Sequence, residues 1–338
     1  MLAVERALSI QVHPSQAQAA AGFAREQAAD VPQAQRSYVD PYAKPEMLLP
    51  VTEFAAMAGL RRRDQVVQML AGLDVPALRP VLLALKSQAG QAGPAGTLAT
   101  LATWPRAQRH ALARSIRDRA RSLLSGPAAS LDADQRSSLE WVVTLANQHP
   151  SDPLVVAPLV LRLHRLQAGQ AMYLPTGVPH AYLSGIGLEI MASSDNVVRA
   201  GVTNKHVDGQ ELAHLLDPDA MPLLEVPRVA LGSHEMRWQL PVPEFALSQV
   251  VVDNVRVTLS GKPGDPAGPE VLLCLRGEVT VLSYNRNLSL RGGQSAFLRA
   301  SASPAALAGK GEVYRASIGS TSPDNARPTT ARPEPTPF

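Results

Sequence analysis

The chain has 338 residues, which exceeds the size of one compact domain and allows more than one hydrophobic core. Its 32 Lys and Arg residues nearly balance its 29 Asp and Glu residues, and a net charge of +3 does not favour a nucleic-acid partner. No run approaches the roughly 18 consecutive apolar residues of a membrane span, and the first residues lack the apolar segment of a secretory signal. The one cysteine, Cys274, excludes a disulfide within the chain. We therefore expect a soluble, cytoplasmic protein without a nucleic-acid or membrane partner.

The first predicted strand covers residues 8–14, where apolar and polar residues alternate with a period of two. The alternation directs side chains to opposite faces, with Leu8, Ile10 and Val12 on one face and Ser9, Gln11 and His13 on the other. A half-buried strand has this pattern. The strand begins a few residues into the chain, and we expect no preceding segment that could supply a neighbouring strand.

From about residue 60 to residue 148 the pattern is helical. Within residues 105–125, apolar residues recur on one helical face, at Leu112, Ile116, Ala120 and Leu123. Asp132 is predicted to be the N-cap of the next helix. The segment 88–96, which is rich in Gly, Ala and Gln, is expected to be a break between helices.

Short apolar runs punctuated by Gly and Pro return from residue 154 and predict β-strands. Residues 161–175 are predicted to form a strand, a turn at Gly169 and a second strand, and residues 187–192 a further strand. After a helix near residues 210–216, the runs between 226 and 319 are spaced like the strands of a small antiparallel barrel or sandwich.

Two short groups near the N-terminus could carry chemistry. Gln11 and His13 leave the same face of their strand, which would present adjacent ligands to a metal inside a barrel, although solvated strands also carry such pairs. Lys44 and Glu46 flank Pro45, which stiffens the backbone between a cation and a carboxylate. Solvated loops contain the same tripeptide, so neither group identifies a site by itself.

A third group lies between residues 180 and 205. His180 and Tyr182 would share one face of a strand, and Glu189 follows on the next predicted strand. The polar cluster after it contains Arg199 and Lys205, which would suit a phosphorylated substrate. An ordinary turn and a structural ion pair are the alternative interpretation of this cluster.

The order of these groups resembles the type I mannose-6-phosphate isomerases of the cupin superfamily. The segments that carry the resemblance are LSIQVHP at 8–14, KPE at 44–46, HAY at 180–182 and SDNVVRAG at 194–201. They occur in the family's order with a helical region between them. The resemblance covers nearly the whole chain except its last residues.

The resemblance implies a mainly β fold with an α-helical insertion, in which two cupin-like β-barrel (jelly-roll) domains accompany a helical domain. The expected parts are the start of a catalytic cupin domain at 1–59, a helical domain at 60–150, the remainder of the catalytic cupin domain at 151–220, a C-terminal cupin-like domain at 221–319 and a disordered Pro- and Thr-rich tail at 320–338.

The family's motif further implies a zinc-dependent isomerase that interconverts mannose 6-phosphate and fructose 6-phosphate through a cis-enediol, for GDP-mannose supply or mannose catabolism. One Zn²⁺ per chain would be held by Gln11, His13, Glu46 and His180, a mixed nitrogen and oxygen set that suits this ion. We expect a monomer whose partner is a small sugar phosphate.

The remaining positions match the family's pocket. The expected catalytic residues are Arg199, Glu189, Asp195 and Lys44, and the expected substrate-binding residues are Ser9, Tyr182 and Lys205. Of the two acidic positions considered for proton transfer, Glu189 is favoured. Whether each lysine serves the phosphate or the sugar oxygens stays open.

Two departures from the family bear on activity. Family members carry an N-terminal segment with early strands of the catalytic cupin, whereas Met1 lies just before the first predicted strand here, so we expect a misassigned start rather than a truncated chain. Ala43 replaces a histidine that is usual before the KPE lysine, and Tyr42 an asparagine. The alternatives are a non-catalytic, truncated relative and a different cupin such as an iron oxygenase, against which Gln11 and the two cations argue.

Overall fold

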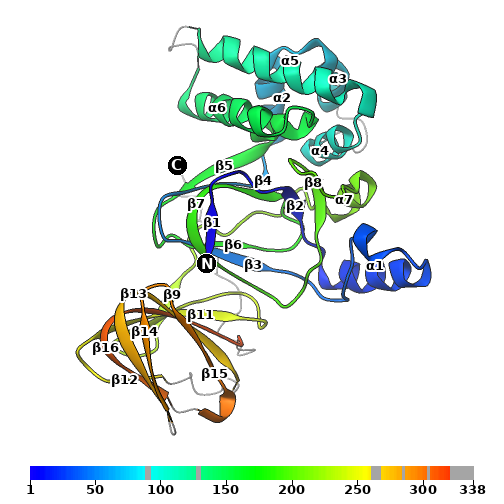
Figure 1. Cartoon of the computed structure of the whole chain (residues 1–338). Helices are drawn as coiled ribbons and strands as arrows, with labels where there is room; N and C mark the ends of the chain where they lie inside the picture. The colour runs from blue at the N-terminus through cyan, green and yellow to red at the C-terminus, as the bar shows by residue number, and fades with distance from the viewer. Residues whose placement is uncertain (88–92, 127–130, 260–267, 284–285, 303–304, 320–338) are drawn as a thin grey trace, which may run out of the picture. The chain divides into compact units, whose positions relative to one another are not determined.

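The computed structural model describes residues 1–87, 93–126, 131–259, 268–283, 286–302 and 305–319. The chain forms two compact units, Met1–Glu225 and Val226–Phe338, called unit 1 and unit 2 below (Figure 1). The finer division into five parts stays a prediction, and the expected disorder of the tail concerns residues 320–338, outside the described part of the chain. The described helices include none that is long and apolar enough to cross a membrane.

Unit 1 is built on an eight-stranded sheet organised around one long strand, β7 (His180–Met191). Antiparallel pairing joins β7 to four strands from the N-terminal part of the chain, namely β1 (Leu2–Val4), β2 (Ile10–Val12), β3 (Glu46–Pro50) and β4 (Phe54–Leu60). The other three strands are β5 (Leu161–Leu166), which pairs with β4, β6 (Met172–Leu174), which pairs with β3, and β8 (Val198–Gly201), which pairs with β2. The pairing of β2 with β7 therefore places Gln11 opposite His180.

The first predicted strand is confirmed at β2, where Ile10 and Val12 are fully buried, but Leu8 lies outside it and is exposed. As predicted, none of the described residues before β2 supplies it with a neighbouring strand, but these residues do form a strand that was not predicted, β1, which pairs with residues 185–187 of β7. Three residues are too few to show a period of two in the sequence. The partners of β2 itself, β7 and β8, come from much later in the chain.

The described part of the helical region contains five α-helices and two 3-10 helices, of which the shorter, η2 (Pro76–Leu78), joins the first two α-helices. The others are α2 (Arg63–Leu73), α3 (Arg79–Ser87), α4 (Pro94–Ala102), α5 (Arg106–Leu124), α6 (Ala133–Gln148) and η4 (Pro153–Leu159). Figure 1 shows α2–α6 gathered at one end of unit 1, next to β4 and β5. Asp132 caps α6 as predicted, because its carboxylate accepts a hydrogen bond from the Gln135 amide at 2.8 Å.

The predicted break at 88–96 is wrong at its end, because α4 begins at Pro94; residues 88–92 lie outside the described part. Proline fits the first turn of a helix, where its missing N–H is not needed. Leu98 and Leu101 of α4 are fully buried, and this burial stabilises a segment whose small residues gave no helical signal.

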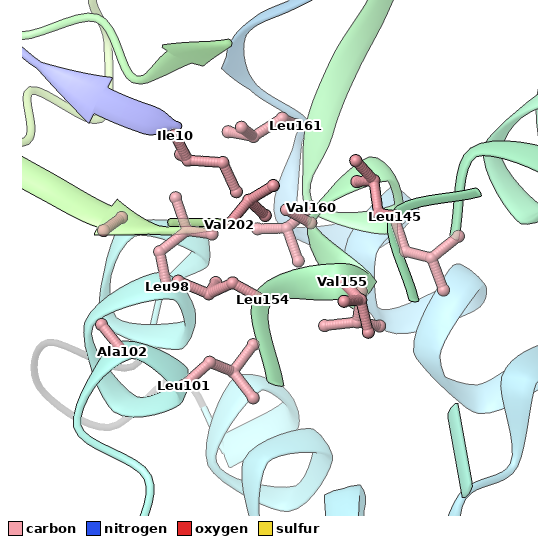
Figure 2. Packing of buried hydrophobic residues seen from close by; sticks show 14 of the residues in the cluster. Ile10, Leu98, Leu101, Ala102, Leu145, Leu154, Val155, Val160, Leu161 and Val202 are labelled. Carbon is pink, nitrogen blue, oxygen red and sulfur yellow. The ribbon is translucent and has the colours of Figure 1, made fainter. Parts of the chain in front are cut away.

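The helices and the sheet share one hydrophobic core. Figure 2 shows Ile10 of β2, Leu98 of α4, Leu154 of η4 and Val202, which follows β8, packed in one cluster. Each is at most 2% exposed. Because these side chains are fully packed, they fix the backbone of β2 and β8. The helical region therefore helps to set the positions of residues on these two strands.

The remaining α-helices in the described part of unit 1 are α1 (Gln16–Ala28), which Ser15 caps, and α7 (Gly209–Leu215), which Asp208 caps; a 3-10 helix, η1 (Gln33–Gln35), follows α1. Ser15 forms a capping box with Gln18, in which each side chain bonds the other's backbone amide. Both helices flank the segments that carry the candidate site residues.

Two predicted strands of the sequence form one strand in the structure, β7, which carries His180, Tyr182 and Glu189. Its pairing with β4 skips Leu183, so β7 contains a bulge. Gly185 follows with a φ of +126°, a conformation in which a side chain would be strained, and an added Cβ would lie 2.8 Å from the Glu53 carbonyl. The bulge shifts by one residue the alternation of side chains between the two faces of β7. It also bends the strand after Leu183.

Unit 2 is a second eight-stranded antiparallel sheet. Its strands are β9 (Arg228–Ala230), β10 (Glu235–Trp238), β11 (Ala246–Asp253), β12 (Val257–Leu259), β13 (Glu270–Ser283), β14 (Arg286–Arg291), β15 (Ser295–Leu298) and β16 (Ala305–Ser317). Alternate residues such as Val250, Leu272 and Val313 form its core, in which the buried Cys274 packs as a small apolar side chain. The predicted fold class, mainly β with a helical insertion, is confirmed.

Candidate metal centre

Three buried side chains from separate strands meet inside unit 1. The Nε2 atom of His13 lies 3.2 Å from Oε1 of Glu46, and Nε2 of His180 lies 3.4 Å from Oε2 of the same carboxylate. His13 directly follows β2, and Glu46 and His180 begin β3 and β7. Each of the three is at most 3% exposed. The fourth predicted ligand, Gln11, lies at the same centre, with its amide nitrogen 3.3 Å from Nε2 of His180.

The backbone fixes the orientation of both imidazole rings. Nδ1 of His13 lies 2.7 Å from the carbonyl oxygen of Asn196, and Nδ1 of His180 lies 3.0 Å from that of Val178. A carbonyl only accepts hydrogen bonds, so each Nδ1 carries the proton and donates it. Each Nε2 then directs its lone pair towards Glu46, which is the arrangement of histidines that bind a metal.

The charges at the centre favour a cation between these groups. Burial lowers the pKa of the His13 imidazole, so the ring is neutral at neutral pH. Burial raises the pKa of the Glu46 carboxyl, but attraction to His13 and His180 in their protonated forms outweighs burial and holds that pKa well below its ordinary range, so Glu46 is a carboxylate. Nε2 of His13 and Oε2 of Glu46 are buried without a hydrogen bond within the described ranges. Two imidazole lone pairs against a carboxylate fit a divalent metal ion, and Zn²⁺ prefers this donor set.

Lys44 places a positive charge at the edge of the centre. Its ammonium group lies 3.1 Å from Oε1 of Glu46, and its side chain is only 11% exposed. Pro45 separates the two residues and holds this stretch extended. The lysine can therefore neutralise part of the carboxylate's charge and still present a donor beside the centre.

Glu189 and Tyr182 are brought to the same side of β7 by the bulge between them. Glu189 is opposite Leu48 on β3, two residues from Glu46, so the two carboxylates lie on one face. Burial and the charge of Glu46 raise the pKa of Glu189. Burial and the charge of Glu189 raise the pKa of the Tyr182 phenol well above its ordinary value. A protonated phenol thus stands beside a carboxyl group that can take up a proton.

Arg199 and Lys205 line a separate cavity. Arg199 is the partner of Gln11 in the pairing of β2 with β8. Together with Lys205 it lines a cavity of about 240 Å³, whose other polar lining residues are Arg36, Ser37, His206 and Asp208. The cavity is rich in cationic groups and suits an anion.

The other predicted site residues stay predictions. Ser9 is half-buried, and it precedes β2 by one residue. Asp195 is exposed and makes none of the described contacts of the centre; its amide donates a hydrogen bond to the Asp40 carboxylate. Of the two substituted positions, Tyr42 is 58% exposed, and the Ala43 amide donates to the Gln16 side chain.

Sequence reasoning missed Asn196, which the structure places in the support of the centre. Besides its carbonyl contact with His13, its side-chain amide donates to the carbonyls of Asp40 and Tyr42 and accepts from the amide of Val39. The residue is fully buried. Its place beside Asp195 in a polar turn was a signal, but an Asp-Asn pair is common in turns and does not show which carbonyl it exposes.

The family model of the type I phosphomannose isomerase catalytic domain matches residues 1–63. Mannose-6-phosphate isomerases from Shigella flexneri and Escherichia coli (strain K12) are 33% and 32% identical to the chain, and each alignment covers 93% of this chain and 77% of the relative. The crystal structure of a mannose 6-phosphate isomerase bound with zinc and yttrium matches with a TM-score of 0.79 at 27% identity, covering 94% of this chain and 78% of that one. A phosphomannose isomerase mutant from Salmonella typhimurium matches with a TM-score of 0.77 at 27% identity, covering 93% and 76%.

Proposed function

Because the chain belongs to the type I phosphomannose isomerase family, we propose that it is a zinc-dependent isomerase that interconverts mannose 6-phosphate and fructose 6-phosphate. One observation carries the proposal: two buried imidazoles and a carboxylate converge, and the carbonyls of Asn196 and Val178 fix the tautomer of both rings. The zinc named for a similar structure supports the choice of ion.

His13, Glu46 and His180 would hold the ion, with Gln11 as the fourth ligand. Rotation of the Gln11 amide exchanges its nitrogen and oxygen, so the residue can present an oxygen to a cation. A bound Zn²⁺ supplies a Lewis acid that polarises the carbonyl and hydroxyl oxygens of an open-chain sugar. With one anionic ligand among the four, the net charge of such a site stays positive.

The reaction moves a proton between two neighbouring carbons. A base removes the proton from C2 of the aldose, the electron pair forms the cis-enediol, and the proton returns to C1 while the O2 proton passes to O1. Glu189 suits the base, because burial and Glu46 raise its pKa and so strengthen the carboxylate as a base. Tyr182, which stays protonated, can donate a hydrogen bond to a sugar oxygen.

The cationic cavity suits the phosphate of the substrate. Arg199 and Arg36 can each form two parallel hydrogen bonds with phosphate oxygens, and Lys205 adds a third cation at the rim. Arg199 is opposite Gln11, so a sugar phosphate anchored there would extend its carbon chain towards the metal centre. Lys44, beside Glu46, is then available to the sugar oxygens.

The test is a coupled isomerase assay on the full chain, with mannose 6-phosphate and with or without added Zn²⁺. We expect one bound zinc per chain and turnover that requires zinc and stops when a chelator is added. His180→Ala should abolish both the bound zinc and the turnover. His214→Ala, which replaces an exposed histidine, is the control and should retain zinc and turnover. Soluble, zinc-loaded protein without turnover would overturn the proposal in favour of a non-catalytic relative, and Ala43→His would then test whether the missing imidazole is the cause.

A further inference from the structure

The residue that follows β8 has a strained backbone. Val202 has a φ of +56°, in the left-handed region that a β-branched side chain strongly disfavours. Its side chain is 2% exposed and packs in the core of unit 1 (Figure 2). A conformation of this kind persists only where the surrounding structure over-determines it, and such residues concentrate at functional sites.

Asp152 holds this residue. One of its carboxylate oxygens, Oδ2, accepts a hydrogen bond of 2.7 Å from the Val202 amide, and the other, Oδ1, accepts one of 3.0 Å from the amide of Leu154. Asp152 is buried, at 7% exposure, where it caps η4. The preceding Gly201 lies so close that an added Cβ would meet Oδ2 at 3.0 Å. The Asp152 carboxylate therefore lies close to both Gly201 and Val202, the two residues joined by this peptide bond.

The helical region balances the charge of this carboxylate. Arg109 of α5 donates to Oδ1 of Asp152 at 3.2 Å and to the carbonyl of Ala102, the last residue of α4, at 3.0 Å. A buried carboxylate without such a partner would be costly. Arg109 thus links the end of one helix, through Asp152, to the backbone that leaves β8.

The turn at Val202 lies, along the chain, between two of the three cations that line the anion cavity. Arg199 precedes it on β8, and Lys205 follows it in the loop that leads to α7. His206 and Asp208, which also line the cavity, belong to the same loop. Because the left-handed residue changes the direction of the chain between Arg199 and Lys205, its conformation determines the spacing of these two charges.

We propose that Asp152 is a positioning residue for substrate phosphate, because its hydrogen bond to the strained Val202 amide holds Arg199 and Lys205 around one anion. The identity of the substrate rests on the proposed function. The positioning role rests on the hydrogen bond between Asp152 and Val202. Asp152 does not touch the cavity itself. Its loss should therefore weaken binding of the phosphate and leave the chemical step at the metal centre intact.

The test is the variant Asp152→Asn in the full-length, zinc-loaded chain. One oxygen becomes an NH₂ group while the size is kept. At the Oδ1 position that group would face two donors, Leu154 and Arg109, so it takes the Oδ2 position, where only the hydrogen bond from the Val202 amide is lost. We expect the KM for mannose 6-phosphate to rise about tenfold with little change in kcat, and the Val202 amide to exchange its hydrogen faster. Leu145→Ala is the matched control, because it removes a buried side chain of the same core from α6 without a hydrogen bond to the turn.

The outcomes separate this inference from the proposed function. An unchanged KM in Asp152→Asn, or an equal rise in Leu145→Ala at a temperature where both are folded, would overturn the positioning role. If the chain shows no turnover, calorimetry can still measure its binding of inorganic phosphate. Phosphate binding that weakens about tenfold in Asp152→Asn would then support the inference although the isomerase proposal had failed. A parent chain that binds neither phosphate nor substrate would overturn both.

Discussion

The imidazole of His13 is held by a backbone carbonyl more than 180 positions away: its Nδ1 donates to Asn196 at 2.7 Å, a separation of 183 residues. The contact selects the tautomer that presents Nε2 to Glu46. Asn196 also ties the segment around Asp40 in place through its side chain. A single turn therefore sets both a ligand's orientation and the loop that leads to Lys44 and Glu46.

Asn196→Asp is expected to weaken zinc binding by about 10- to 100-fold, as changes behind a metal ligand usually do. The amide nitrogen of Asn196 lies 2.7 Å from the Asp40 carbonyl, 2.8 Å from the Tyr42 carbonyl and 3.1 Å from Oδ1 of Asp40, so a carboxylate oxygen in its place would face three acceptors. Competition with a chromogenic chelator measures the affinity. Asn147→Asp, on the exposed side of α6, is the matched control. Unchanged zinc affinity in a folded Asn196→Asp chain would show that the turn does not support His13.

The variants Glu189→Gln and Asp195→Asn discriminate between the two acidic residues considered for proton transfer. Glu189 shares a face with Glu46 and has a raised pKa, whereas Asp195 is exposed. We expect kcat to fall by about 10²- to 10⁴-fold in Glu189→Gln, the usual range for a lost general base, with zinc content unchanged. Asp195→Asn should change kcat little. Loss of turnover in Asp195→Asn with activity retained in Glu189→Gln would reverse the assignment.

The parts of the fold that the sequence predicts are those with a local signal. The alternation over residues 8–14 and the helical face of Leu112 and Ile116 each repeat often enough to show a period. Both elements are confirmed, although Leu8 lies outside the strand. The strand β1 and the helix α4 have no such signal. One is too short for a period, and the other consists largely of small residues that become helical because Leu98 and Leu101 are buried against the rest of unit 1.

The candidate site shows the same limit. Motif residues that match a family could be named from the sequence, and the structure brings Gln11, His13, Glu46 and His180 together. The alternation of β7 alone would place Tyr182 and Glu189 on opposite faces, because their numbers differ by an odd count. The bulge at Leu183 removes that difference, and a bulge depends on how β4 pairs with β7 rather than on any local pattern. The contact between Asp152 and Val202 is likewise purely tertiary.

His164 should make the stability of the chain fall in mildly acidic solution. Burial lowers the pKa of its imidazole, although a hydrogen bond with the Ala58 carbonyl opposes this shift. The unfolded chain, with a pKa of about 6.5 at this residue, then binds more protons than the folded chain, so the stabilisation is complete above that pH and is lost as the pH falls below it. The loss is at most about 1.4 kcal/mol per pH unit for one proton.

Urea unfolding of the parent chain and of His164→Gln between about pH 7.5 and about pH 5 measures this contribution. Glutamine can still donate to the Ala58 carbonyl but does not titrate in this range. We expect the free energy of unfolding to fall less steeply with pH in His164→Gln than in the parent chain. His214→Gln, at an exposed position, should follow the parent. Parallel curves for the parent and His164→Gln would contradict the prediction.

Two glycines in helices should respond to alanine in opposite directions. A Cβ at Gly22 of α1 would lie 2.5 Å from the ring of Tyr38, which is 1% exposed and is held by a hydrogen bond of its amide to Glu26 at 3.0 Å. The ring cannot move away cheaply, so Gly22→Ala should lower the free energy of unfolding by about 1–3 kcal/mol despite the better helix propensity of alanine. Gly72 of α2 has no atom within 4 Å of its Cβ position, so Gly72→Ala should raise it by about 0.5–1 kcal/mol. Urea unfolding of both variants checks the signs, and a stabilised Gly22→Ala chain would show that Tyr38 does not pack against α1 as closely as described.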